Sequence, residues 1–119
     1  MCDVTDAEVF LDRLKPLLEN GKLYFQPRST RKTREFMSAE GLAVEDVFRI
    51  IRQLEPEHYR KGPQADDDGS PGEVWIFYYP YSEFFPPFER ILLYIKLKLW
   101  IDADGDVGIV MSFHDEGNT

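Results

Sequence analysis

The sequence lacks several features that would assign it to a common class of protein. Cys2 is the single cysteine, which excludes an internal disulfide and, with no signal peptide in view, predicts a cytoplasmic protein. The longest apolar run, Ile91 to Ile101, is interrupted by two lysines and is too short to cross a membrane as a helix. There is no phosphate-binding loop, no Gly-x-Ser-x-Gly motif and no spacing of zinc ligands. Several classes of enzyme are therefore excluded, and no cofactor is expected.

Positive charge is also scarce. The chain has 14 lysines and arginines against 22 aspartates and glutamates, so its formal net charge is −8. A protein that binds nucleic acids indiscriminately is usually basic, and this balance argues against such a function. The distribution is uneven, because the segment from Asn20 to Arg34 holds five bases and no acid. A negative average can therefore hide a positive patch on the surface.

Acidic residues near the end of the chain invite comparison with a calcium-binding loop. The segment Asp102 to Asp106 lacks the D-x-D-x-D-G spacing and the terminal glutamate of an EF-hand loop. Aspartate and glycine are also the residues that favour a tight turn. We therefore interpret this segment as a turn and predict no metal site.

The chain of 119 residues, of which 43% are hydrophobic, is large enough for one domain with a real core. Segments with helical spacing of apolar residues precede segments with strand spacing. This order is typical of an α+β domain, in which helices cover one face of a mainly antiparallel sheet of three or more strands. Pro16 lies inside the first expected helix and should bend or split it. The expected elements are a helix from Thr5 to Asn20, a short strand or extended linker at Leu23 to Phe25, a short helix or basic loop at Ser29 to Glu40, a helix from Val44 to Leu54, and a strand from Glu73 to Tyr79.

Two loops are expected in the second half of the chain. The segment Gly62 to Gly72 has three consecutive aspartates and no large apolar residue, so nothing in it is expected to pack. We predict that it is mobile and exposed. Prolines bound the second loop, Tyr81 to Phe88, whose aromatic side chains need a partner.

The segment from Glu89 to Glu116 has the pattern of one long β-hairpin. Odd positions from Ile91 to Ile101 are all aliphatic, whereas most even positions carry polar or amphipathic groups. A two-residue Asp-Gly turn would pair aliphatic residues with polar ones. A three-residue loop, Ala103 to Gly105, with its glycine in a G1 bulge, instead pairs aliphatic residues with one another. The pairs expected from this loop are Ile95 with Phe113, Leu97 with Met111, and Leu99 with Ile109.

The same register gathers chemical groups on the non-core face of the hairpin. It sets Tyr94 opposite His114 and Lys96 opposite a serine, with Lys98 and Trp100 further along the strand. A histidine by itself is more often an exposed residue at a strand end than a catalyst. Here an imidazole, a phenol and ammonium groups are expected together. These are the groups needed to cleave a phosphodiester without a metal ion.

Five short blocks of the sequence carry a resemblance to a known family. They are Leu14 to Leu23, Gly41 to Val47, Leu54 to Arg60, Leu93 to Leu97, and Val110 to His114. In this order they resemble the MqsR toxin family, the motility quorum-sensing regulators, which belongs to the RelE-like toxins of bacterial type II toxin–antitoxin systems. The resemblance implies a RelE-like fold and a metal-independent endoribonuclease, an mRNA interferase, that is held inactive by a cognate antitoxin protein.

The resemblance also implies an active site. Members of the family use a basic residue after a tyrosine, a tyrosine in a strand and a lysine in the last strand, and the matching positions here are Arg60, Tyr94 and His114. To these we add Lys96 from the non-core face of the hairpin. In this prediction His114 is general acid or base, Tyr94 orients or shares the proton, and Arg60, Lys61 and Lys96 stabilise the phosphorane. The predicted substrate-binding residues are Tyr59, Lys61, Lys98, Trp100, Arg28, Arg31, Lys32 and Arg34.

The sequence departs from the family pattern in places that bear on activity. The lysine of the last strand is His114 here, which keeps a proton carrier but not a permanent charge. The glutamine expected after the tryptophan of the middle strand is Ile76. The chain is also acidic, whereas a toxin that binds RNA is usually basic. The alternative is therefore a non-catalytic RelE-like protein-interaction module, with the aromatic segment Tyr78 to Phe88 as its docking surface.

Overall fold

The computed structural model describes residues 4–27, 31–67, 69–80, 92–103 and 105–115. The three α-helices of these residues lie in the first half of the chain and four of the five strands in the second, so the predicted α+β class is confirmed. None of these helices has both the length and the apolar content that a membrane span requires. In chain order the elements are α1 (Val4–Glu19), β1 (Leu23–Phe25), α2 (Arg31–Glu40), α3 (Val44–Arg52), the 3-10 helix η1 (Pro56–His58), β2 (Tyr59–Gln64), β3 (Glu73–Pro80), β4 (Leu92–Asp102) and β5 (Gly105–Asp115).

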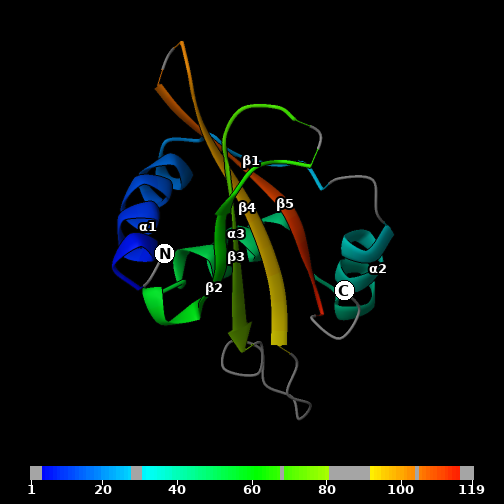
Figure 1. Cartoon of the computed structure of the whole chain (residues 1–119). Coiled ribbons are helices and arrows are strands. Elements are labelled where there is room, and N and C mark those ends of the chain that lie inside the picture. Colours follow the sequence, from blue (N-terminus) through cyan, green and yellow to red (C-terminus); the bar gives the residue numbers. More distant parts are fainter. Residues whose placement is uncertain (1–3, 28–30, 68, 81–91, 104, 116–119) are drawn as a thin grey trace.

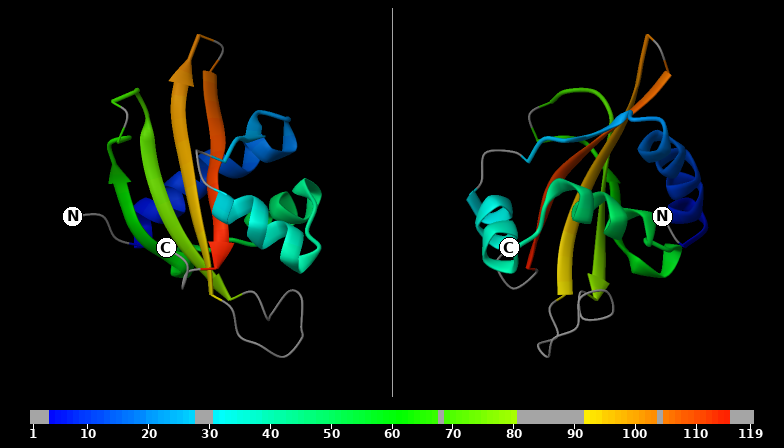
Figure 2. Two further views of the ribbon diagram at one scale, coloured as in Figure 1. Left: turned by 90° about the vertical axis from the view of Figure 1, so that its right-hand side faces the viewer. Right: turned by 180° about the vertical axis from the view of Figure 1, so that it is seen from behind.

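The strands form one five-stranded sheet in the order β1-β5-β4-β3-β2. All neighbours are antiparallel except β1, which runs parallel to β5. The sequence pattern does not predict β2 or the parallel pair. Figures 1 and 2 show α1 and α3 on one side of the sheet, while the opposite face carries no helix of the described residues. We call this opposite face the open face.

The core lies between the sheet and helices α1 and α3. Alternate residues of β4, from Leu93 to Leu99, are buried on the helix side. From α1, the ring of Phe10 stacks on Trp75 and Phe77 of β3, with centroids 4.6 and 5.8 Å away. Burial of one large apolar side chain stabilises the fold by about 1.5–3 kcal/mol. The helices therefore determine which face of each strand is buried and which side chains remain on the open face.

Helix α1 continues through Pro16 as one helix of 16 residues, so of the two predicted effects, a bend or a split, the split is wrong. A proline inside a helix costs about 3 kcal/mol, because it removes one hydrogen bond and crowds the preceding turn. The following turn still closes, since the Asn20 N–H donates to the Pro16 carbonyl at 3.0 Å. Leu14 and Leu17, on either side of the proline, are both buried against the core. Packing on the sheet thus outweighs the cost of the proline.

Helix α2 covers the edge of β5 beyond the point where β1 ends. β1 pairs only with Gly108 to Val110, so it leaves the last part of that edge without a strand partner. There the Phe113 N–H donates to the buried Thr33 hydroxyl at 3.1 Å. Phe36 of α2 also contacts the Phe113 ring, with centroids 6.3 Å apart. These contacts hold α2 beside the end of β5 that carries His114.

One end of the β4–β5 hairpin has the predicted register. Tyr94 pairs with His114, and Ile95 pairs with Phe113. Ile95 and Phe113 are fully buried in the core, as the alternating pattern predicts. This part of the prediction is confirmed.

Toward the tip of the hairpin the register differs, because a β-bulge follows Lys96. The predicted three-residue loop and the predicted partners of the two leucines are therefore wrong. The reason lies at Gly108, where an added Cβ would be 2.9 Å from Leu23 Cδ1 and 3.2 Å from Leu14 Cδ1. A glycine faces the core here because β1 and α1 approach so closely, which the pattern of aliphatic residues does not reveal. The observed pairs are Leu97 with Val110, Leu99 with Gly108, and Asp102 with Gly105.

The segment between β2 and β3 packs on the open face, so the prediction that nothing in Gly62 to Gly72 packs is wrong. Its first three residues belong to β2. Further along, Asp66 is only 5% exposed, because its carboxylate binds a lysine of the sheet. The second predicted loop, Tyr81 to Phe88, lies outside the described residues.

Candidate functional site

Four neighbouring strands, β2 to β5 in Figure 1, each contribute one side chain to a row across the open face of the sheet. Tyr78 of β3 pairs with Tyr94 of β4, and Tyr94 pairs with His114 of β5. The rings of Tyr94 and His114 are stacked, with centroids 5.1 Å apart and planes 20° apart, and Tyr78 lies 6.0 Å from Tyr94. Arg60 of β2 extends the row, since its guanidinium carbon lies 4.6 Å from the centre of the Tyr78 ring. We call these four residues the aromatic row.

His114 is oriented by its own backbone. Nδ1 lies 2.9 Å from the carbonyl oxygen of Asp115. A carbonyl oxygen only accepts hydrogen bonds, so this contact assigns the proton to Nδ1. In the neutral ring Nε2 then carries the free lone pair. His114 as a residue is 4% exposed, and its imidazole is a candidate proton acceptor held in place by Asp115 on one side and Tyr94 on the other.

Tyr94 is placed to donate a proton and not to accept one. Burial raises the pKa of its hydroxyl, and the nearby Tyr78 and Asp67 raise that pKa further because negative charge close by opposes ionisation. Tyr94 therefore remains a neutral phenol at neutral pH. The row thus sets a hydrogen-bond donor beside a candidate acceptor.

Lys96 supplies a positive charge beside the aromatic row. It follows Tyr94 by two residues on the same face of β4, which is a separation of about 6.6 Å along the strand. Within the described part of the chain, no carboxylate lies within ion-pair distance of Lys96. Arg60, at the other end of the row, is exposed. An anion bound over the row would meet both cations.

Lys98, which was predicted to bind substrate, is already paired. Its Nζ donates to the Asp66 carboxylate at 2.6 Å and to the Ser70 hydroxyl at 2.5 Å. The side chains of Lys98 and Asp66 are only 6% and 1% exposed. In this structure the charge of Lys98 is therefore balanced by the segment between β2 and β3.

Trp100 lies away from the aromatic row, toward the hairpin tip. It pairs with Val107, and the Lys98 ammonium lies 5.7 Å from the centre of its ring. Trp100 and Val107 line an open groove of about 400 Å³ together with Tyr24, Gln26 and Ile109. The structure therefore places Trp100 on the open face but not beside Tyr94 and His114.

Tyr59 is on the helix side of the sheet. Its ring packs edge-on against Trp75 and Phe77, and its hydroxyl donates to the Gly62 carbonyl at 2.7 Å. The side chain is part of the core and is separated from the aromatic row by the sheet. Its predicted role in substrate binding has no geometric support.

The other described basic residues that were predicted to bind substrate belong to β2 and α2. Lys61 is exposed, and its backbone pairs with Ile76 of β3, the strand that also carries Tyr78. Helix α2 lies beside the end of β5 and carries the bases on either side of Thr33 in the sequence, which are Arg31, Lys32 and Arg34. Arg28 lies outside the described residues.

Two residues of this face were not placed beside Tyr94 and His114 from the sequence: Asp66, and Tyr78, which was predicted only as the start of the alternative docking segment. Tyr78 had a detectable signal, because the alternation in strand Glu73 to Tyr79 places it opposite the face occupied by Phe77 and Tyr79. Asp66 had none, since its partner Lys98 is 32 positions away in the sequence. A run of aspartates in a glycine-rich segment is usually solvated.

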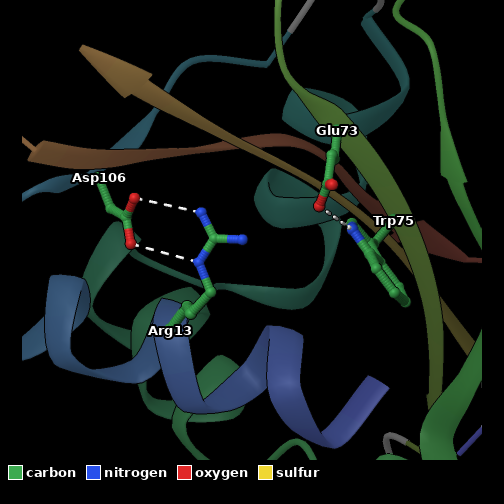
Figure 3. A network of polar contacts seen from close by, with 4 residues as sticks. All are labelled: Arg13, Glu73, Trp75 and Asp106. Atoms are coloured by element: carbon green, nitrogen blue, oxygen red, sulfur yellow. Dashed lines mark hydrogen bonds and ion pairs between the residues drawn. The ribbon is translucent and has the colours of Figure 1, made fainter. Parts of the chain in front are cut away.

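A second polar network lies on the helix side of the sheet. Figure 3 shows Arg13 of α1 directed at Asp106 near the hairpin tip, with Glu73 and Trp75 beside it. Arg13 donates to both carboxylate oxygens, at 3.2 and 3.4 Å, and this hydrogen bond raises the pKa of Arg13. Trp75 Nε1 donates to the Glu73 carboxylate at 3.3 Å. The contact of Arg13 with Asp106 joins α1 to the start of β5. The four residues in Figure 3 include none of the aromatic row.

No protein-family model, curated protein or solved structure matches this chain. Among the described residues there is also no group of three or more histidine, cysteine, aspartate or glutamate side chains that could hold a metal ion. Among the described residues, the aromatic row with Lys96 beside it brings together a phenol, an imidazole and two cations.

Proposed function

We propose that this protein is a metal-independent endoribonuclease that cuts mRNA by attack of the substrate 2′-hydroxyl on the adjacent phosphate. The observation that supports it is the stacked pair of Tyr94 and His114, with Arg60 and Lys96 at hand. Cleavage of RNA by this route needs a proton acceptor for the 2′-hydroxyl, a proton donor for the leaving oxygen and positive charge for the phosphorane. The open face offers each of these groups.

With this geometry we propose narrower roles for these residues than the sequence alone supports. His114 Nε2 takes the proton of the 2′-hydroxyl as its oxygen bonds to phosphorus. Tyr94, whose raised pKa keeps it protonated, gives its proton to the 5′-oxygen as the bond between that oxygen and phosphorus breaks. The products are a 2′,3′-cyclic phosphate and a 5′-hydroxyl. Proton exchange with solvent then returns both side chains to their starting forms.

Arg60 and Lys96 stabilise the charge that develops on phosphorus. They lie on β2 and β4, on either side of the strand that carries Tyr78. A phosphate held over the aromatic row would receive charge-assisted hydrogen bonds from both. Lys61 and the bases of α2 would contact flanking phosphates. The partner implied by this function is a cognate antitoxin protein in the cytoplasm, which would cover the open face.

A second candidate function is favoured by one observation. His114 is 4% exposed, so a substrate hydroxyl reaches Nε2 only when the atoms that cover the ring move aside. A buried histidine stacked on a tyrosine also suits a non-catalytic interaction module. In that case Arg60 and Tyr78 would contact a partner protein and no bond would be broken.

The chemistry of the products distinguishes the two functions. Purified protein should cut a single-stranded RNA in the presence of a chelator, and the fragments should end in a 2′,3′-cyclic phosphate and a 5′-hydroxyl. The matched control is the same sequence with 2′-deoxy sugars, which lacks the attacking hydroxyl and should stay intact. If the RNA also stays intact at every pH, the interaction module replaces the nuclease.

A further inference from the structure

The segment between β2 and β3 is held on the open face by charge and not by apolar packing. Its described residues, 65–67 and 69–72, include no large apolar side chain, and Asp66 is the one among them that is buried. Asp66 binds the Lys98 ammonium at 2.6 Å, and Ser70 binds both Lys98 and Asp66. An ammonium group that binds a carboxylate in this way can bind a phosphate oxygen by the same charge-assisted hydrogen bonds.

The backbone of the segment is shaped to bring two polar groups to one ammonium. The Gly69 N–H donates to the Asp66 carbonyl at 3.0 Å, which closes a turn from Asp66 to Gly69 directly before Ser70. Gly72 has a φ of +121°, and a Cβ at this position would lie 3.0 Å from Lys98 Cε. A glycine at position 72 therefore lets the segment lie flat against the lysine side chain.

Lys98 stands in line with the groups that we assign to cleavage. Tyr94, Lys96 and Lys98 are alternate residues on the open face of β4, about 6.6 Å apart along the strand. An RNA strand that passes over Tyr94 and continues along β4 would bring its next phosphates to Lys96 and Lys98. The acidic segment also acts on the row itself, because Asp67 is one of the groups that raise the pKa of Tyr94.

From these contacts we propose that Asp66 occupies, on Lys98, the place of an RNA backbone phosphate, so that the segment between β2 and β3 is a built-in competitor of the substrate. This inference rests on the proposed function. Loss of one partner from a buried ion pair is strongly unfavourable, but exchange of one anion for another keeps Lys98 paired. The segment therefore leaves most readily when a phosphate replaces the carboxylate. While Asp66 is bound to Lys98, the apparent affinity of the protein for RNA is lower, because only molecules with an uncovered Lys98 can bind a phosphate at this lysine.

The first test is Asp66→Asn, which removes the competing charge and keeps the shape of the side chain. Binding to a single-stranded 2′-deoxy oligonucleotide is measured by fluorescence anisotropy, so that no cleavage is needed. If Lys98 is uncovered in about one molecule in ten, the variant should bind about 10-fold more tightly. The matched control is Asp12→Asn, which changes the net charge equally at an exposed site on α1 and should bind like the parent.

Two further variants make the result specific to the ion pair. Ser70→Ala weakens the contact without a change of charge, and it should also bind more tightly, by a smaller factor. It tests the proposal if Asp66→Asn does not fold. In Lys98→Met the anion site is gone, so adding Asp66→Asn to this variant should give no further gain.

The proposal is overturned if Asp66→Asn and Asp12→Asn bind the oligonucleotide equally, or if neither binds it. Its outcome is separate from that of the proposed function. Tighter binding by Asp66→Asn in a protein that leaves RNA intact would support the competitor and reject the nuclease. RNA cleavage by the parent with no gain in Asp66→Asn would support the nuclease and reject the competitor.

Discussion

Tyr94 and His114 are stacked on each other, but different neighbours determine their protonation. The pKa of Tyr94 is raised by burial first and then by Tyr78 and Asp67, whereas the Asp115 carbonyl directs the proton of His114 to Nδ1. The phenol is thereby kept as a donor, and the imidazole is left with an acceptor at Nε2. Cleavage of a phosphodiester by an internal hydroxyl needs this combination of acid and base within one site.

The raised pKa of Tyr94 predicts a specific dependence of stability on pH. Below the ordinary tyrosine pKa of about 10, the folded and unfolded states both carry the proton. As the pH rises from there toward the folded pKa, the unfolded state loses its proton first, so the free energy of unfolding falls. Denaturant titrations should show Tyr94→Phe gaining stability relative to the parent above about pH 10. Tyr24→Phe, at an exposed tyrosine, is the control, and an identical response of the two variants would contradict the shift.

At the scale of elements, the end of β5 depends on α2. A strand edge without a partner exposes N–H and C=O groups that cost free energy when buried. β1 is too short to cover this edge, and the Thr33 hydroxyl of α2 accepts the Phe113 N–H instead. His114 follows directly in the chain, so the position of the candidate base depends on a helix whose buried residues are Thr33 and Met37.

Thr33→Val tests this dependence. The substitution keeps the shape of the side chain and removes the acceptor, which leaves the buried Phe113 N–H unpaired at a cost of about 1–3 kcal/mol. Thr33→Ser keeps the hydroxyl and should cost less. The free energy of unfolding and the hydrogen exchange of the Phe113 amide report the two effects. Equal stability of the valine and serine variants, with unchanged exchange at Phe113, would show that the bond does not hold the edge.

At the scale of the whole molecule, the local pattern of apolar residues predicts which face of the sheet the helices cover. Contacts between distant parts of the chain determine the register near the hairpin tip. The alternation in β4 predicts the buried face and the pairing of Tyr94 with His114, because each residue of a strand points opposite to its neighbours. The bulge near the hairpin tip escapes prediction, since the residues that approach Gly108, Leu14 and Leu23, come from distant parts of the chain.

The candidate site divides in the same way. Tyr94, His114 and Lys96 could be placed together from the sequence, because all three lie on one hairpin. The ion pair of Lys98 with Asp66 could not be predicted from the sequence. The two residues are 32 positions apart, and the segment that carries Asp66 has no large apolar residue that would indicate packing. Strands and helices are predictable because their apolar residues recur at regular spacing, whereas an ion pair between distant residues produces no such pattern in the sequence.

The measurement that tests the nuclease most directly is the single-turnover rate of RNA cleavage by four proteins: the parent, Tyr94→Phe, His114→Gln and the double variant. Glutamine is used because His114 is buried and the side chain must fill its space. Loss of a positioned acid or base typically slows a reaction about 10²- to 10⁴-fold, and groups that act as a unit lose less together than the product of their separate losses. We predict a loss in this range for His114→Gln, a smaller loss for Tyr94→Phe, and a double variant little slower than His114→Gln. A folded His114→Gln variant that cuts RNA as fast as the parent would contradict the account.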